Sequence, residues 1–206
     1  MPTPRRTPQP RQARATRTRQ RIIDETARCV VEEGYAAATT PRILERAGAT
    51  WGVVQYHFAN REGLLVAVVE AGTDQLVAGL AEVGPADPGD ADQVRRVVDA
   101  AWEAFAHPLS VASFEILIAT RGMRSSGADL GEHWRRLEEL GAGLFAAPES
   151  VRLARLVWAT LRGLVMVQML VPEPLDPSRE LATLTSLITA HVAAHRDAAG
   201  AEARGH

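Results

Sequence analysis

The spacing of hydrophobic residues predicts helices near the start of the chain. Residues 19–33 carry apolar side chains at helical spacing and stop at Gly34, a residue type that often closes a helix. Residues 39–47 predict a helix of about two turns. Residues 48–58 begin with a glycine turn and continue as a second short helix. This helix is too short, and its side chains are expected to be too exposed, for it to belong to a core.

Helical spacing continues downstream, interrupted only by turn-forming segments. Residues 84–92 are rich in glycine, proline and aspartate and predict a linker. Further helices are predicted over residues 61–83, 94–105, from 108 onward, 129–146, 148–171 and 178–196. No stretch alternates like a strand. The pattern therefore predicts an all-α protein of about nine helices, with a small N-terminal bundle followed by a larger helical domain.

The two short helices joined by a glycine turn are typical of a helix-turn-helix, whose second helix lies in the major groove of DNA. Trp51 and Gln55 stand at the first and fifth positions of that helix, one turn apart on one face, with Val53 between them. A glutamine side chain can read adenine, and an indole can press on a thymine methyl group. Gly52 would let the backbone come close to DNA.

Phosphate contacts are expected where three helices start, because helix N-termini, hydroxyl groups and arginines attract anions. The candidates are Thr39, Thr40, Arg42, Thr50, Tyr56, His57 and Arg61. Pro41 favours Thr40 as the residue that caps the first of the two short helices.

The charge distribution separates the two ends of the chain. Residues 1–62 contain 11 arginines and 6 acidic residues, whereas residues 63–206 contain 12 arginines and 19 acidic residues. Seven of the arginines fall within the first 21 residues, where there is no acidic residue. This pattern indicates an arm that follows phosphates or enters a minor groove, with a solubilising tail as the alternative.

The same residues resemble a known family, the tetracycline-repressor (TetR) family of bacterial transcriptional regulators. The resemblance is carried by Gly34, Tyr35, Thr39, Ile43, Ala47, Gly48, Thr50, Gly52, Tyr56, Phe58 and the run Asn60, Arg61, Glu62, Gly63 and Leu64. It implies a helix-turn-helix DNA-binding domain at residues 18–65, and it favours Thr39 as the cap. Residues 1–17 would then be a disordered Arg/Pro-rich arm, 66–200 a ligand-binding and dimerisation domain, and 201–206 a tail.

The resemblance also implies a double-stranded palindromic operator, a homodimer and a small-molecule effector that releases a repressor from DNA. Candidate pocket residues are large and mostly apolar: Trp102, Phe105, Phe114, Ile118, Met123, His133, Trp134, Trp158 and Met166. They favour an apolar or aromatic effector over a charged one, although each taken alone also fits an ordinary core. The alternative function is a ligand-independent DNA-binding or architectural protein with the same N-terminal domain.

The last two predicted helices carry more apolar surface than one helix hairpin covers. Two copies could bury it as a four-helix bundle. The expected dimer interface comprises Leu153, Leu156, Leu161, Leu164, Leu184, Leu187, Ile188 and His191. Packing within one chain is the alternative.

Signatures of other protein classes are weak. His191 and His195 are four residues apart, but the glutamate of a zinc protease motif is missing between them. A phosphate-binding glycine loop follows a strand, whereas Gly141-Ala142-Gly143 lies within a helical pattern. We therefore expect no enzyme activity, cofactor or metal. The single cysteine, Cys29, is interpreted as a buried structural thiol. No signal peptide is visible, and the apolar run 164–171 is too short to span a bilayer, so a soluble cytoplasmic protein is expected.

Overall fold

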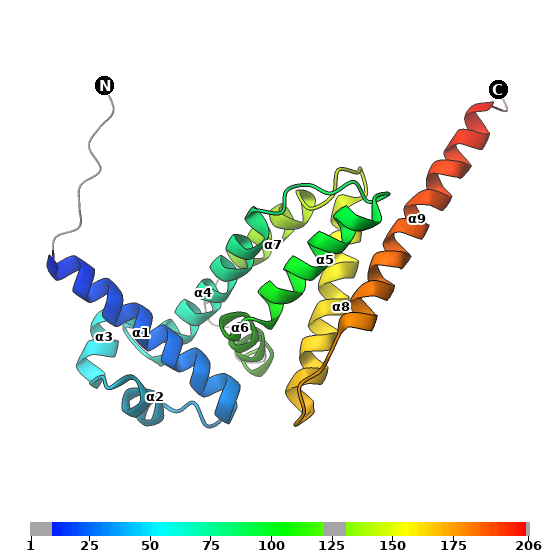
Figure 1. Ribbon diagram of the computed structural model, residues 1–206. Coiled ribbons are helices and arrows are strands. Elements are labelled where there is room, and N and C mark those ends of the chain that lie inside the picture. Colours follow the sequence, from blue (N-terminus) through cyan, green and yellow to red (C-terminus); the bar gives the residue numbers. More distant parts are fainter. Residues whose placement is uncertain (1–9, 122–130, 205–206) are drawn as a thin grey trace, which may run out of the picture. The chain divides into compact units, whose positions relative to one another are not determined.

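A computed structural model of the protein describes residues 10–121 and 131–204, which fold into nine helices (Figure 1). These residues contain no β-strand; a single parallel bridge joins Ala86 to Phe145. The all-α fold predicted from the sequence is confirmed. The chain divides into two compact units, with boundaries between Gly72 and Thr73 and between Ser110 and Val111.

The N-terminal unit contains α1 (Pro10–Glu33), α2 (Thr40–Ala47), α3 (Trp51–Phe58), the first half of α4 (Arg61–Ala81) and most of α6 (Pro108–Ala119). α1 packs against α2. Apolar side chains that are almost completely buried form its core: Ile22, Ile23, Val30, Ile43, Val54, Leu64 and Val68. Cys29 is also fully buried, as predicted, and burial raises the pKa of its thiol.

The start of α1 differs from the prediction. Residues 10–17, assigned to a disordered arm, form the first turns of this helix. Pro10 stands at the first position, where a proline costs no helical hydrogen bond, and the alanines, arginines and glutamine that follow are good helix formers. The rest of the predicted arm, residues 1–9, lies outside the described residues.

The C-terminal unit contains α5 (Ala91–Ala106), α7 (Gly131–Ala142), α8 (Ser150–Leu170) and α9 (Ser178–Arg204). α5 packs against both α8 and α9, and α7 packs against α8 (Figure 1). α5 begins where the Asp90 carboxylate accepts bonds from the Asp92 and Gln93 N–H groups. Its residues Val94, Val97, Val98 and Ala101 are fully buried, which makes α5 the centre of this unit.

Two helix ends in the C-terminal unit also differ from the prediction. α7 ends at Ala142 rather than at residue 146, because the chain turns there towards α8. The buried Ser150 hydroxyl fixes that turn: it donates to the Gly141 carbonyl (3.0 Å) and accepts from the Phe145 N–H (3.1 Å). At the other end of the unit, α9 continues to Arg204, eight residues beyond the predicted end.

Two of the helices, α4 and α8, are long and apolar enough to cross a membrane by length and composition alone. Half of the most apolar window of α4 and a third of that of α8 are buried inside the protein. Core helices of soluble proteins share this length and composition.

Candidate functional site

α3 buries only one narrow stripe of its surface. Val54 and Phe58, one turn apart, are 1% and 6% exposed, and both face the core of the N-terminal unit. Trp51, Gly52, Gln55 and Tyr56 are exposed, and the Tyr56 side chain reaches 80%. Val53 and His57 lie at the edge between the two faces. Most of α3 therefore remains available for contact with another molecule.

The turn before α3 has the geometry predicted from its glycine. Gly48 closes α2 in the left-handed conformation, with φ of 54°, and the N–H groups of Gly48 and Ala49 donate to the carbonyls of Glu45 and Leu44. Thr39 and Thr50 are the N-cap residues of α2 and α3, and neither side chain makes a capping hydrogen bond. Thr39 is therefore the cap that the resemblance implied, and Thr40 is the first residue of α2.

A tight turn connects α3 to α4. Ala59 has φ of 65° and ψ of −49°, and the Asn60 N–H donates to the Phe58 carbonyl at 2.7 Å, which is a γ-turn. The Asn60 carboxamide oxygen then accepts from the Gly63 N–H at 2.8 Å and so caps α4, as predicted. A Cβ atom on Gly63 would lie 2.1 Å from the Phe58 carbonyl oxygen. The orientation of α3 therefore depends on the absence of a side chain at Gly63.

Arg61 holds the loop between α1 and α2. Its guanidinium lies 5.1 Å from the centre of the Tyr35 ring and donates to the Tyr35 hydroxyl (3.3 Å) and the Ala38 carbonyl (3.2 Å). The Tyr35 N–H donates to the Glu115 carboxylate of α6 at 2.5 Å. Arg61, predicted to bind phosphate, thus already has partners within the protein.

Glu115 was not among the site residues predicted from the sequence. It lies 80 residues from Tyr35, and no local pattern in the sequence connects the two. The only weak signal is an acidic residue among the apolar residues of α6.

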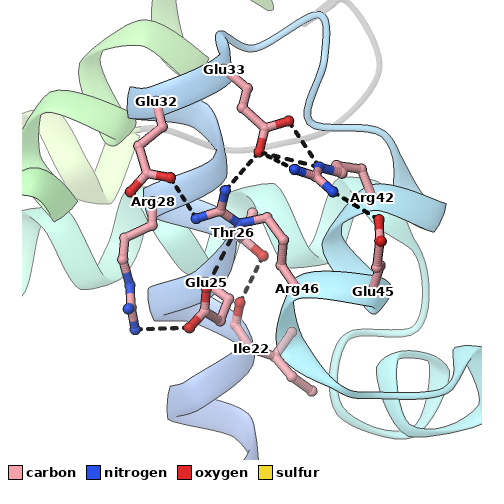
Figure 2. Close-up of polar contacts among 9 residues, drawn as sticks. All are labelled: Ile22, Glu25, Thr26, Arg28, Glu32, Glu33, Arg42, Glu45 and Arg46. Atoms are coloured by element: carbon pink, nitrogen blue, oxygen red, sulfur yellow. Dashed lines mark hydrogen bonds and ion pairs between the residues drawn. The ribbon is translucent and has the colours of Figure 1, made fainter.

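Arg42 and Arg46 form a network of ion pairs that fastens α2 to α1 (Figure 2). Arg42 makes a two-pronged contact with Glu33 (2.9 and 3.0 Å) and also pairs with Glu45 (2.8 Å). Arg46, with only 18% of its side chain exposed, pairs with Glu33 (2.6 Å) and with Glu32 (2.7 Å). Hydrogen bonds from Arg42, and then from Arg46, lower the pKa of Glu33. Arg42 was predicted to bind phosphate; its guanidinium also pairs with two carboxylates, and the phosphate contact stays a prediction.

Basic residues of α1 lie beside α3. Arg14, Ala15 and Thr18 line one side of a shallow groove whose other side is formed by α3 residues that include Gly52 and Tyr56. Further along the helix, Arg19 lies 5.3 Å from the centre of the Phe58 ring.

The helical form of residues 10–17 also orders the arginines of the predicted arm. Arg14, Arg17 and Arg21 recur at intervals of three and four residues, which places them on one side of α1, and all three are exposed.

The predicted pocket residues are only partly brought together. The Phe105 and Trp158 rings are in contact, with centres 5.3 Å apart, and both are buried in the C-terminal unit. Trp102 is half-buried on α5, and His133 contacts the Thr73 hydroxyl at 2.6 Å. Met166 is exposed on α8, and Phe114 and Ile118 belong to the N-terminal unit. Trp134 lies on α7, and Met123 falls outside the described residues.

The predicted dimer residues fall into two groups. Leu153, Leu161 and Ile188 are buried in the core of a single chain, and Leu184, which is 4% exposed, borders a groove between α8 and α9. Their burial places the contacts of Leu153, Leu161 and Ile188 within one chain, and the dimer interface stays a prediction. Leu156, Leu187 and His191 are exposed, and Leu164 is half-buried. Val167 and Leu170 of α8, which the prediction omitted, are exposed as well.

Comparison with known proteins places the N-terminal segment in one family. Residues 22–68 match the family described as "Bacterial regulatory proteins, tetR family". The HTH-type transcriptional repressor AcnR of Corynebacterium glutamicum is 32% identical over 69 residues, which are 34% of this chain and 37% of AcnR. The chain thus spans about a third of the length of the first curated relatives it matches.

A second relative is matched over most of its length. The uncharacterized HTH-type transcriptional regulator TtgW of Pseudomonas putida is 35% identical over 115 residues, which are 56% of this chain and 82% of TtgW. Among solved structures, the multidrug binding protein EbrR in complex with ethidium matches 82% of this chain and 97% of its own, with a TM-score of 0.57 and 24% identity. This structural likeness supports the fold. From the helix-turn-helix geometry and these relatives, the chain belongs to the TetR family of bacterial regulatory proteins.

Proposed function

We propose that the protein is a homodimeric transcriptional repressor that binds a palindromic DNA operator through α3 and leaves it when a small effector binds the C-terminal unit. The first curated relatives are named repressors. Regulators of this family are soluble DNA-binding proteins, which supports a cytoplasmic location.

The observation that carries the proposal is the exposed face of α3. A short helix that buries only Val54 and Phe58 contributes little to the core for its length. A major groove admits one α-helix, and the side chains of that helix read the base edges. Gln55 and Trp51, both exposed and one turn apart, are the residues we assign to base reading. Gly52 and Val53 allow the backbone to approach.

Phosphate contacts are assigned to residues that flank α3. Thr50, Tyr56 and His57 lie on α3 or at its start, and Arg14, Arg17 and Arg21 form a basic row along α1. Thr39 and Thr40 at the start of α2 keep unbonded hydroxyls near that helix N-terminus. Arg61 stays in this set through its position at the start of α4, but its main role is to position Tyr35.

Dimerisation is assigned to the exposed apolar side of α8 and α9. Leu156, Leu170 and Leu187 are 48%, 78% and 59% exposed. A groove between the two helices is lined by Leu156, Thr160, Leu184 and Leu187, among others, and it offers a surface into which a second copy can pack. A dimer brings two recognition helices to two half-sites, which one short helix alone lacks.

An effector site in the C-terminal unit is supported by a cavity beside Trp158. The structurally similar EbrR is a multidrug binding protein complexed with ethidium. Binding would favour a conformation with less affinity for DNA, and a hundredfold release needs about 2.7 kcal/mol of differential affinity.

The test starts from an operator selected from random duplex DNA. Gln55→Ala is expected to lose about 1–3 kcal/mol of binding and to relax the preference at one base pair of each half-site. Gln75→Ala, the same replacement on α4 outside the DNA-binding unit, is the matched control. If folded Gln55→Ala binds with unchanged affinity and preference, the assignment of base reading to Gln55 is wrong. Operator binding that no small molecule reverses would favour the ligand-independent architectural alternative.

A further inference from the structure

Two histidines lie one turn apart on the exposed side of α9. His191 and His195 are separated by four positions and both are exposed, whereas Val192 between them is buried. Leu187, which precedes His191 by another four positions, is exposed as well. Residues four apart share one face of a helix. The histidine pair therefore continues the exposed stripe of α9 that contains Leu187.

The two imidazole rings are close to each other. Their centres are 4.1 Å apart, with an angle of 45° between the ring planes. Two histidines four positions apart on one helix face are also the pair that holds zinc in the HExxH motif, where the glutamate between them serves the hydrolytic reaction. His191 and His195 thus have the spacing and the proximity that two ligands of one metal ion require.

A hydrogen bond to the backbone fixes the tautomer of the second ring. The Nδ1 atom of His195 lies 2.8 Å from the carbonyl oxygen of His191. A carbonyl oxygen only accepts hydrogen bonds, so Nδ1 carries the proton, and Nε2 of the neutral ring keeps its lone pair. Histidines that bind metals commonly donate their other ring N–H to a carbonyl or carboxylate in this way. His195 therefore presents Nε2 as the ligand atom.

The composition of the site favours an exchangeable transition-metal ion. Among the residues that the structure describes, no group of three or more His, Cys, Asp or Glu side chains could hold a metal ion. A structural zinc site uses four protein ligands, so an ion held by two imidazoles keeps open positions for water. Imidazole ligands suit Zn²⁺, Ni²⁺ and Cu²⁺, whereas Mg²⁺ and Ca²⁺ prefer oxygen ligands.

We propose that His191 and His195 together bind one divalent transition-metal ion per chain, with Nε2 of His195 as one ligand and the His191 imidazole as the other. Cu²⁺ should bind more tightly than Ni²⁺ or Zn²⁺, and Mg²⁺ and Ca²⁺ should not bind. The sequence-based expectation of no metal rested on the missing glutamate, which excludes a metalloprotease but leaves the two imidazoles as ligands. The site does not depend on the proposed function.

Calorimetric titration of the full chain without a polyhistidine tag tests the site, with Ni²⁺, Zn²⁺ and Mg²⁺ as the probes. One Ni²⁺ or Zn²⁺ ion is expected to bind per chain. His191→Ala and His195→Ala should each weaken binding at least about tenfold, because even the loss of an outer-shell partner costs about 10–100-fold. Unchanged affinity in either folded variant would overturn the proposal, as would binding of Mg²⁺ that matches that of Zn²⁺.

A change of register separates spacing from histidine content. The double variant Ala193→His with His195→Ala keeps two histidines but places them two positions apart, about 200° around the helix. Both changed positions are exposed, so the core is not disturbed. The double variant should bind Ni²⁺ no more tightly than His195→Ala does. Recovery of the affinity of the unchanged protein would mean that the one-turn spacing is not required, and the proposed geometry would be wrong.

Nuclear magnetic resonance of the ring nitrogens identifies the ligand atom. In the chain loaded with one equivalent of Zn²⁺, Nδ1 of His195 should keep the chemical shift of a protonated nitrogen, and Nε2 should shift on metal binding. Zn²⁺ at Nδ1 would require the hydrogen bond to the His191 carbonyl to break and would overturn the assigned coordination. Circular dichroism confirms that each variant used in the titrations keeps its helices.

Discussion

The N-terminal and C-terminal units use arginine in opposite settings. Where α2 packs against α1, Arg42 and Arg46 form ion pairs with glutamates that neutralise their positive charges (Figure 2). In the C-terminal unit, Arg162 lies over an aromatic ring and borders a mostly apolar cavity. The first arrangement fixes two helices relative to each other, and in the second the guanidinium is partly buried beside an aromatic ring. The role of an arginine therefore depends on the residues that surround its guanidinium.

One helical glycine in each unit shows a further contrast, Gly63 of α4 and Gly163 of α8. In the N-terminal unit the γ-turn at Ala59 brings the Phe58 carbonyl against Gly63, whereas a Cβ at Gly163 of α8 would meet no atom within 4 Å. The position of α3 therefore depends on the exact course of the backbone, and α8 has space along its exposed side.

The largest expected effect comes from Gly63→Ala. The added Cβ overlaps the Phe58 carbonyl, so the turn must open, at a cost of about 3 kcal/mol or more in the free energy of unfolding. Gly163→Ala, the matched control in the other unit, should raise stability by about 0.5–1 kcal/mol, because alanine favours a helix. Urea unfolding measures both. Equal effects of the two substitutions would contradict the contrast between the surroundings of Gly63 and Gly163.

A smaller effect is expected for Glu115→Ala, which tests whether the N-terminal unit depends on α6. Loss of the acceptor for the Tyr35 N–H should lower the free energy of unfolding by about 1 kcal/mol, and loosening of the α1–α2 loop should weaken operator binding. Glu115→Gln retains an acceptor oxygen and should retain most of both properties. Identical losses in the two variants would mean that the charge of Glu115, and not its hydrogen bond, matters.

The next comparison separates arginines that are free to meet DNA from arginines tied to carboxylates. Arg14→Ala, beside α3, should lower the slope of log affinity against log salt by about one unit. Arg42→Ala should leave that slope unchanged, because Glu33 and Glu45 already occupy its guanidinium. Affinity would be measured by fluorescence anisotropy between 50 and 200 mM salt, a range of the kind used for such slopes. A reduced slope for Arg42→Ala would support its assignment as a phosphate contact.

The smallest expected effect concerns Glu33 and acid. Because Arg42 and Arg46 lower the pKa of Glu33 in the folded protein, its carboxylate stabilises the fold above the ordinary pKa of about 4.3. That contribution is lost as the pH falls through the lowered folded value. The melting temperature of Glu33→Gln should therefore fall below that of the unchanged protein at pH 7, with the difference shrinking toward pH 3. A constant difference across this range would assign the effect to packing.

Much of the N-terminal unit was predictable because its signals are local. Gly34 and Gly48 both adopt positive φ, as their positions after helices indicated, and Asn60 caps α4. α2 ends at Ala47 as predicted and begins at Thr40, one residue after the predicted start. α3 ends at Phe58, as predicted. The start of α1 was missed, because the proline-rich residues before it suggested an irregular arm.

The roles of individual side chains were less predictable. Arg42 had the right residue type and position for phosphate, but its partners Glu33 and Glu45 were not deduced from the pattern. The leucine stripe of α8 and α9 was recognised, yet periodicity could not tell which of its members face α5 and which face solvent. Arg162 was not among the predicted pocket residues, since an arginine in a long helix is usually solvated.

The amino-acid sequence by itself determined the helical fold, the helix-turn-helix and the family, because helix periodicity, caps and turns depend on residues within about four positions of one another. Tertiary structure decided which charges are neutralised, which leucines remain exposed, how Glu115 reaches Tyr35, and that Trp158 and Arg162 share a cavity. These outcomes depend on burial and on contacts between distant segments, whose energies arise only when the helices pack.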